Sequence, residues 1–215
     1  MRARQTVTKG DGPTFVSHTG IAAPFLRANV DTDIIMPANR QSMRVHSSLA
    51  DICFESLRYF WDGSENPSFI LNQEPFRKAS ILLVGTNFGA GSSRETAVAG
   101  LMEFGFRSIV APSFGGSFYG NCFANSMLPV TLDAEVIREI ADQVTLNPAV
   151  EMTVDLEKSQ IERPGLSAVA FNIDSRLRNK MLLGLRDLDE ILLHGEDIEA
   201  FQEEDRIRRP WIYWR

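Results

Sequence analysis

Residues 80–111 read SILLVGTNFGAGSSRETAVAGLMEFGFRSIVA, and this stretch decides the fold class. Residues 80–85 form a short apolar run closed by glycine, which is typical of a strand buried on both faces. After a glycine-rich turn, apolar residues recur at helical spacing over residues 92–104, and Gly105 stands where a helix would end. A second buried strand is predicted over residues 107–111. The order strand, loop, helix, strand predicts a right-handed β-α-β crossover between parallel strands.

The α/β alternation continues and then changes character. A strand is predicted over residues 128–132, followed by a helix that Asp133 caps and that runs to about residue 144. Beyond Asn147-Pro148 the chain is predicted to be rich in strands, over residues 150–156, 159–162 and 168–173. After Asp174, apolar residues at helical spacing predict two or three short helices that form a C-terminal helical arm.

The length and composition of the chain predict one folded domain. With 215 residues, the chain is long enough for a single sizeable core. We expect residues 1–13, which are polar and contain Gly10 and Gly12, to be a flexible tail, and residues 14–215 to form a single α/β domain.

Charge and hydropathy exclude several classes of protein. The net charge is −6, and Lys and Arg do not gather into a phosphate-binding surface, so a nucleic-acid partner is not expected. No apolar run approaches the roughly 18 residues that a membrane span needs, and no secretory signal pattern opens the chain. The prediction is a cytoplasmic protein without a membrane partner.

The glycine-rich loop carries the main chemical signal. Three glycines within residues 85–91 allow the backbone to approach a ligand closely, and the following helix N-terminus attracts anions. Ser92, Ser93 and Arg94 are predicted to face that ligand, and the arginine fork suits a carboxylate. A purely structural alternative is a capping box in which Ser92 caps the helix and Glu95 reaches back. A phosphate cradle is disfavoured because the loop lacks Gly-Lys-Ser/Thr.

A second cluster, residues 29–37, reads NVDTDIIMP. Alternation along an extended segment would place Asp31 and Asp33 on the same side, before a strand-like apolar trio. An Asx-type turn that enters a strand explains the pattern equally well, whereas a calcium loop is disfavoured because no third acidic ligand follows.

A third cluster, residues 111–123, is rich in glycine and aromatic residues and directly follows a predicted strand. Ligands of open α/β sheets bind at the carboxyl ends of strands. Packing is nevertheless the simpler role, and we assign mostly structural roles to Phe114, Phe118 and Phe123.

The chain contains two cysteines, Cys53 and Cys122, which are distant in sequence and have no ligand-like neighbours. Both are expected to be small buried apolar residues, and no metal site is expected within this chain.

Together these clusters resemble the small subunit of 3-isopropylmalate dehydratase, whose fold is the swivelling domain of the aconitase superfamily. The resemblance spans roughly residues 19–211 and rests on residues 29–37, 87–95, 111–121, 128–130, 183–191 and 210–211. The sequence departs from the family pattern at Ala90, where Cys is usual, and at Thr96, where His is usual. Residues 38–41 are also polar where the family tends to be apolar.

The resemblance implies a β/β/α swivelling domain and a hydro-lyase that interconverts 2-isopropylmalate and 3-isopropylmalate in leucine biosynthesis. A serine can act as base if positive potential stabilises its alkoxide, so Ser92, Arg94 and Asp33 are the expected catalytic residues. The expected substrate-binding residues are Ser93, Gly91, Asn29 and Arg40.

The resemblance also implies a heterodimer or heterotetramer with a large subunit that holds a 4Fe–4S cluster, because two separated cysteines cannot ligate one. Two alternatives stay open from the sequence. One is a sister hydro-lyase acting on citramalate, homoaconitate or dimethylmalate, and the other is a free-standing anion- or nucleotide-binding module.

Overall fold

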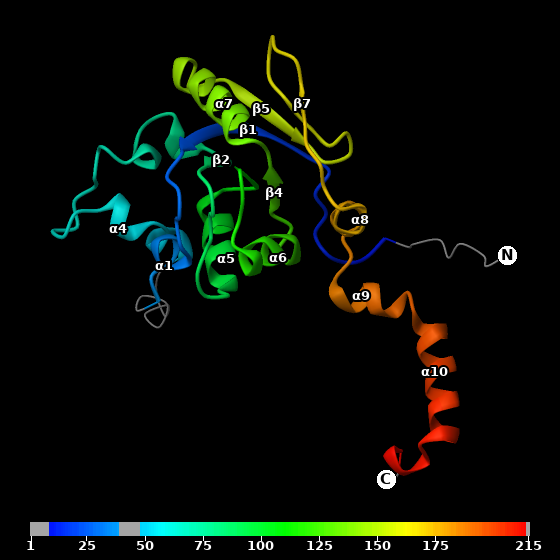
Figure 1. The fold of residues 1–215 in the computed structure, drawn as a ribbon. Helices are drawn as coiled ribbons and strands as arrows, with labels where there is room; N and C mark the ends of the chain where they lie inside the picture. The colour runs from blue at the N-terminus through cyan, green and yellow to red at the C-terminus, as the bar shows by residue number, and fades with distance from the viewer. Residues whose placement is uncertain (1–8, 39–47, 214–215) are drawn as a thin grey trace.

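The computed structural model describes residues 9–38 and 48–213, and its elements alternate between strands and helices (Figure 1). The strands are β1 (Ser17–Phe25), β2 (Ile81–Val84), β3 (Ser108–Ala111), β4 (Leu128–Thr131), β5 (Glu151–Asp155), β6 (Gln160–Glu162) and β7 (Val169–Ala170). The helices are α1 (Thr32–Ile35), α3 (Leu49–Ile52), α4 (Glu55–Arg58), α5 (Glu95–Phe104), α6 (Gly116–Ala124), α7 (Ala134–Leu146), α8 (Ser175–Leu183), α9 (Asp187–Leu192) and α10 (Gly195–Arg208). Short 3-10 turns are η1 (Ile70–Asn72), η2 (Phe76–Lys78) and η3 (Pro210–Ile212).

All the strands belong to one seven-stranded sheet with the order β4-β3-β2-β1-β5-β6-β7. Strand β1 joins the parallel and antiparallel halves of the sheet. Its second half pairs with β2 in parallel, from Ala22 to Phe25, and its first half pairs with β5 antiparallel, from Ser17 to Ile21. Strands β2, β3 and β4 continue the parallel half, and β5, β6 and β7 continue the antiparallel half.

The core lies where helices cover the parallel half of the sheet. Every residue of β2 and β3 is buried, as their continuous apolar sequences predict for strands covered on both faces. Helix α7 covers one face, and α5 and α6 lie on the other (Figure 1). The apolar stripe of α7 faces this core and contains the buried residues Ile137, Ile140 and Val144.

The predicted α/β architecture with a C-terminal helical arm is confirmed, and the predicted β-α-β unit is β2-α5-β3. The helix ends at Gly105 as predicted, but it begins at Glu95, not at Ser92. The strand expected over residues 168–173 is reduced to Val169–Ala170.

The described end of the expected N-terminal tail lies against the end of α8. The amide of Gly10 donates to the carbonyl of Leu183 (2.8 Å), and the amide of Gly12 donates to that of Gly184 (2.9 Å). The first eight residues of that tail lie outside the described residues.

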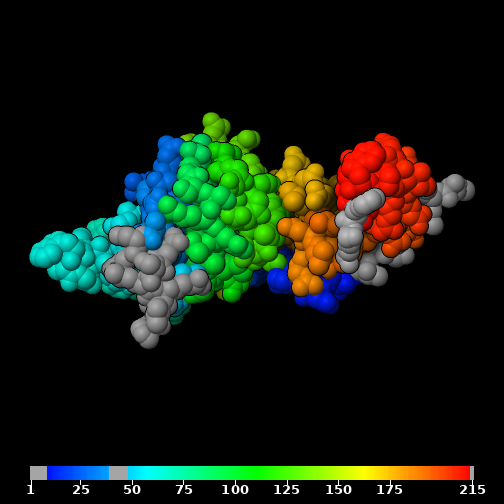
Figure 2. Space-filling model, turned by 90° about the horizontal axis from the view of Figure 1, so that it is seen from below, coloured from blue at the N-terminus to red at the C-terminus, as the bar shows by residue number. Residues whose placement is uncertain are grey.

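Helices α9 and α10 leave the body of the domain and form, with η3, a projecting arm (Figures 1 and 2). Buried Lys180 of α8 fixes the root of this arm through ion pairs with Asp187 and Glu190 of α9. Along the described part of the chain, no helix has the length and apolar character needed to cross a membrane.

Candidate functional site

The glycine-rich loop between β2 and α5 is bound along its length to the segment that precedes α1. The amide of Asn29 donates to the carbonyl of Thr86 (2.8 Å), and the amide of Gly89 donates to that of Val30 (2.7 Å). A third bond runs from the amide of Thr32 to the carbonyl of Ala90 (2.9 Å). Two clusters that lie about sixty residues apart in the sequence therefore form one site.

The third sequence cluster supports this loop from the other side. The amide of Asn87 donates to the hydroxyl of Ser113 (2.9 Å), and the amide of Phe88 donates to the carbonyl of Ser113 (3.1 Å). The rings of Phe88 and Phe118 pack edge to face with centroids 5.5 Å apart. Gly89 has a φ of +72°, and a Cβ there would lie 2.2 Å from the Phe118 ring, so only glycine fits. The aromatic residues of this cluster, including Phe114 and Phe123, pack as expected.

Arg94 and Asp33 meet at the start of α5. Nη1 of Arg94 donates to Oδ1 of Asp33 across an ion pair, in which the arginine side chain is 21% exposed and the aspartate side chain 56% exposed. This hydrogen bond lowers the pKa of Asp33 below its usual range, so the carboxylate stays charged near neutral pH. In the part of the chain that the structure describes, the other guanidinium donors of Arg94 bond no residue.

Ser92 and Ser93 are exposed directly before Arg94. The alternative in which Ser92 caps α5 is wrong, because the cap residue is Arg94 and no side chain completes the cap. The backbone carbonyl of Ser92 accepts from the buried hydroxyl of Thr32 (3.2 Å), and this bond fixes the loop at an exposed residue. Gly91, with a φ of +98°, makes the turn that presents these serines.

Helix α1 corrects the prediction for residues 29–37. Asp31 caps this short helix, because its Oδ1 accepts from the amide of Ile34 (2.7 Å), so Asp31 and Asp33 do not lie on one side of a strand. The Asx-type turn is present, but it leads into a helix. Within the described residues, no three His, Cys, Asp or Glu side chains are grouped to hold a metal ion.

The structure places the remaining candidates as follows. Asn29 is exposed with a φ of +55°, and its Oδ1 accepts from Nδ2 of Asn87 (2.9 Å), which brings it to the edge of the same loop. Ser92, Ser93, Arg94, Asp33, Gly91 and Asn29 are thus all joined by the bonded loop and α1 segments. Arg40 lies outside the described residues.

Sequence reasoning missed Thr32 and Asn87. Thr32 is 1% exposed and joins α1 to the loop, and Asn87 joins the loop to Asn29 and Ser113. The signal for Thr32 was its position between two aspartates, and the signal for Asn87 was its position within the glycine loop, where a residue with a φ of +59° is needed.

Both cysteines are fully buried, and burial raises the pKa of each thiol well above its ordinary value. Thiols in this state are poor metal ligands because the thiolate is the form that binds. They do not suit an iron–sulfur cluster.

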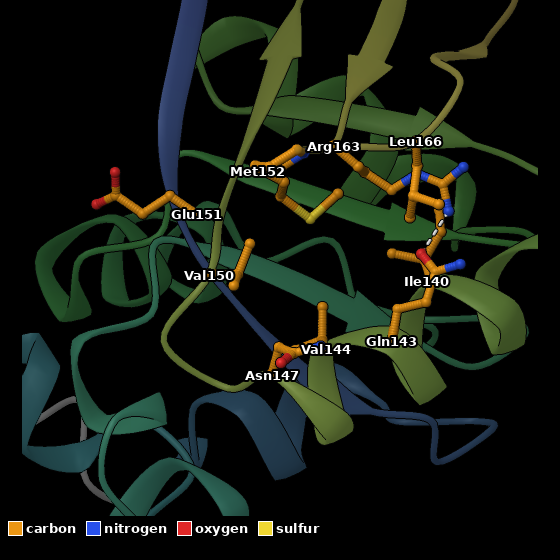
Figure 3. A pocket seen from close by; sticks show the side chains of 11 residues that line it. Ile140, Gln143, Val144, Asn147, Val150, Glu151, Met152, Arg163 and Leu166 are labelled. Atoms are coloured by element: carbon orange, nitrogen blue, oxygen red, sulfur yellow. Dashed lines mark hydrogen bonds between the residues drawn. The ribbon is translucent and has the colours of Figure 1, made fainter.

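A separate groove of about 500 Å³ lies between α7, β5 and residues 163–166, which follow β6, away from the loop site (Figure 3). Its walls include Val144, Val150 and Met152, and Arg163 at one end donates from Nη1 to Gln143 (2.6 Å). Nη1 and Nη2 of Arg163 are bonded to the protein itself, and the walls are mostly aliphatic, so this groove lacks the exposed hydroxyls of the loop site.

Comparison with known proteins identifies the family of this chain. The family model described as the aconitase C-terminal domain matches residues 12–135. The 3-isopropylmalate dehydratase small subunit of Cupriavidus necator is 43% identical over 203 residues, which cover 93% of this chain and 98% of that protein. This chain belongs to the 3-isopropylmalate dehydratase small-subunit family. The protein of the same name from Gluconacetobacter diazotrophicus is 42% identical over 197 residues, covering 92% of this chain and 95% of that one.

A solved structure carries the same fold. The crystal structure of 3-isopropylmalate dehydratase from Methanocaldococcus jannaschii matches with a TM-score of 0.59 at 22% identity, covering 88% of this chain and 99% of that one. The predicted aconitase-type swivelling fold is therefore confirmed. The family model ends within α7, so the strands β5 to β7 and the C-terminal arm of this small-subunit family member lie beyond it.

Proposed function

We propose that this chain is the small subunit of a heteromeric hydro-lyase that interconverts 2-isopropylmalate and 3-isopropylmalate in leucine biosynthesis. The observation that carries the proposal is the arrangement of the Ser92 hydroxyl and the Arg94 guanidinium at the start of α5, with Asp33 beside them. The names of relatives 39–43% identical over almost the whole chain support the same activity.

Ser92 acts as the base in this proposal. The reaction removes a proton from a carbon next to a carboxylate, which requires a strongly basic oxygen. The hydroxyl of Ser92 is exposed on the loop just before a helix N-terminus and close in sequence to Arg94, so fixed positive potential lies where an alkoxide would develop.

Arg94 binds a substrate carboxylate in this proposal, and Asp33 orients the Arg94 guanidinium. A guanidinium has five N–H donors in a planar fork, and the Asp33 bond engages Nη1. The remaining donors can grip a carboxylate in two places, which fixes the substrate carbon relative to Ser92 and converts orientation into rate. Ser93, Gly91 and Asn29 complete the proposed substrate-binding edge.

The metal of the reaction belongs, in this proposal, to the partner. The buried cysteines of this chain do not suit a cluster, and the family resemblance assigns a 4Fe–4S cluster to the large subunit. When bound, that cluster supplies a Lewis acid for the poor hydroxyl leaving group. We further propose a cytoplasmic heterodimer or heterotetramer that has no nucleic-acid or membrane partner.

The alkyl group of the substrate is the least constrained part of the proposal. The polar residues 38–41, which include Arg40, replace a stretch that is apolar in the family pattern, and a polar loop would suit a smaller or more polar side chain. We propose 2-isopropylmalate as the substrate because the relatives are named 3-isopropylmalate dehydratase small subunits. Citramalate, homoaconitate and dimethylmalate are the alternatives.

One reconstitution tests this function. The chain is mixed anaerobically with the large subunit of the same organism, and dehydration of a panel of 2-alkylmalates is measured. We expect turnover of 2-isopropylmalate above the other diacids by the mixture, and none by either chain alone. Preferred turnover of citramalate would change the substrate, and an inactive mixture with an intact cluster would refute the proposed function.

A further inference from the structure

The C-terminal arm is a built element and not a frayed end. Asp205 of α10 is 3% exposed, and its carboxylate accepts from Nε (2.6 Å) and Nη2 (2.8 Å) of Arg209. It also accepts from the hydroxyl of Tyr213 (3.0 Å), so the chain folds back after α10 and η3 is held against the helix. At the root, Arg176 of α8 binds Glu190 of α9 (2.8 Å). Both ends of the arm are therefore fixed by charge-assisted hydrogen bonds.

Within the described residues, this fixed arm presents an open groove with apolar side chains in its walls. A hollow of about 680 Å³ runs between α10 and η3, and its walls combine Ile198, Phe201, Ile212 and Tyr213 with the polar residues His194, Asp197, Gln202, Asp205 and Arg209. Phe201 is 57% exposed and Ile212 55% exposed. Exposed aromatic and aliphatic side chains that lie together on one preorganised surface mark an interaction site.

The charge of α10 indicates the kind of partner. Residues 196–204 contain five acidic side chains and no Lys or Arg. The arginines that follow are already engaged, since Arg209 binds Asp205 and Arg206 stacks over Tyr213 at 5.5 Å. A second copy of this chain, with a net charge of −6, would bring like charges together along the acidic segment. A partner surface on which Lys or Arg surround apolar side chains would complement the groove and the acidic segment beside it.

The position of the arm agrees with a partner that also covers the catalytic loop. Helices α1 and α5, next to whose N-terminal ends the site lies, are below the sheet in Figure 1, and α10 extends beyond them on that same side. Figure 2, seen from below, shows the arm standing beside this face of the body. A protein seated on the site face would also lie beside the arm.

We propose that the groove between α10 and η3 docks the large subunit, which inserts apolar side chains into it and surrounds them with basic ones. This inference rests on the proposed function, which requires a large subunit. It assigns the arm a role that is separate from the catalytic loop. The arm sets the affinity of assembly, whereas Ser92 and Arg94 set turnover once the complex has formed.

Three variants of the full chain test the docking site. Ile198→Asp and Phe201→Asp each place a charge in the groove at an exposed position, so folding is not at risk. Ile207→Asp is the matched control, because Ile207 lies on the same helix, is 86% exposed and does not line the groove. The large subunit of the same organism is immobilised, the dissociation constant of each variant is measured, and light scattering gives the mass of each chain alone.

We expect both groove variants to weaken binding at least tenfold and Ile207→Asp to stay within twofold of the native chain. At saturating concentrations of small subunit, the groove variants should regain the native kcat. Groove variants that bind within twofold of the native chain in an active complex overturn this inference and leave the proposed function intact. A native oligomer that Phe201→Asp dissociates, without loss of large-subunit affinity, identifies a second copy as the occupant and also overturns it. A native chain that neither binds nor activates the large subunit refutes the proposed function instead.

Discussion

Replacing Ser92 by alanine should abolish activity while leaving the fold unchanged. The hydroxyl of Ser92 makes no hydrogen bond within the described residues, and α5 is capped at Arg94 without side-chain help. Its loss should therefore change the free energy of unfolding by no more than about 0.5 kcal/mol, as for an ordinary surface position. For a chain of this size, that is a melting-temperature change within about 2 °C.

The expected effect on catalysis is much larger. Removing a general base typically costs about 10²- to 10⁴-fold in rate. At about 1.4 kcal/mol per tenfold, this corresponds to roughly 3–5 kcal/mol of transition-state stabilisation. Stability and turnover should therefore separate clearly in this variant.

The assay uses reconstituted complexes matched for cluster content, with melting temperature and dehydration rate measured on the same samples. Ser68→Ala is a suitable control, since Ser68 is an exposed serine on a distant loop. If Ser92→Ala keeps more than a tenth of native turnover, Ser92 is not the base, and Ser93 becomes the next candidate. If the melting temperature falls by well over 2 °C, the Ser92 hydroxyl also stabilises the fold, contrary to the reasoning above.

Three further predictions address the loop, the guanidinium and pH. Arg94→Lys should lower kcat/KM about tenfold or more, because an ammonium cannot grip a carboxylate in two places, and an unchanged value would refute the bidentate role. Gly89→Ala should lower the melting temperature by about 10 °C, since its Cβ would meet the ring of Phe118 at 2.2 Å and its φ is +72°, whereas Gly116→Ala, with open space around it, should change little. Burial lowers the pKa of His18, so the unfolded chain takes up that proton at a higher pH than the folded one, and stability should fall as pH drops below about 6.5. A His18→Asn variant should lose part of that slope in melting temperature against pH, and an identical slope would contradict the assignment.

The sequence predicts the parallel half of the sheet well because burial on both faces leaves a simple signature. Residues 80–85 and 107–111 are continuous apolar runs, and the glycine loop and helix between them leave few alternative topologies. Strand β1 was missed for the opposite reason. Its sequence SHTGIAAPF has small residues, a glycine and a proline, and its place at the centre of the sheet depends on partners that are distant in the chain.

The candidate site residues were proposed from their types, and the sequence did not predict how they are arranged. A run of Asp-Thr-Asp before apolar residues fits either an extended segment or a one-turn helix, and four residues are too few to show a helical period. The Ser-x-x-Glu pattern at Ser92 likewise fits a capping box, yet the hydrogen bonds to Val30 and Thr32 hold the loop so that the helix starts at Glu95. In both places tertiary bonds decide between local structures of similar energy.

The exposure of the glycine-rich loop bears on the proposed role of the arm. The backbone of the loop is held on both sides by Asn29, Thr32 and Ser113, so the loop is fixed even though Ser92 and the side chain of Asp33, 56% exposed, face solvent. Water solvates an alkoxide at such a position and makes it a weak base. When another surface covers the site and excludes water, the local dielectric falls and the field of the helix and the arginine becomes stronger. In the proposed function, the large subunit would close the site as well as bring the metal. A small subunit of this design needs a docking element that places the partner accurately over the loop, and a projecting arm held rigid by Asp205 and Lys180 meets that requirement.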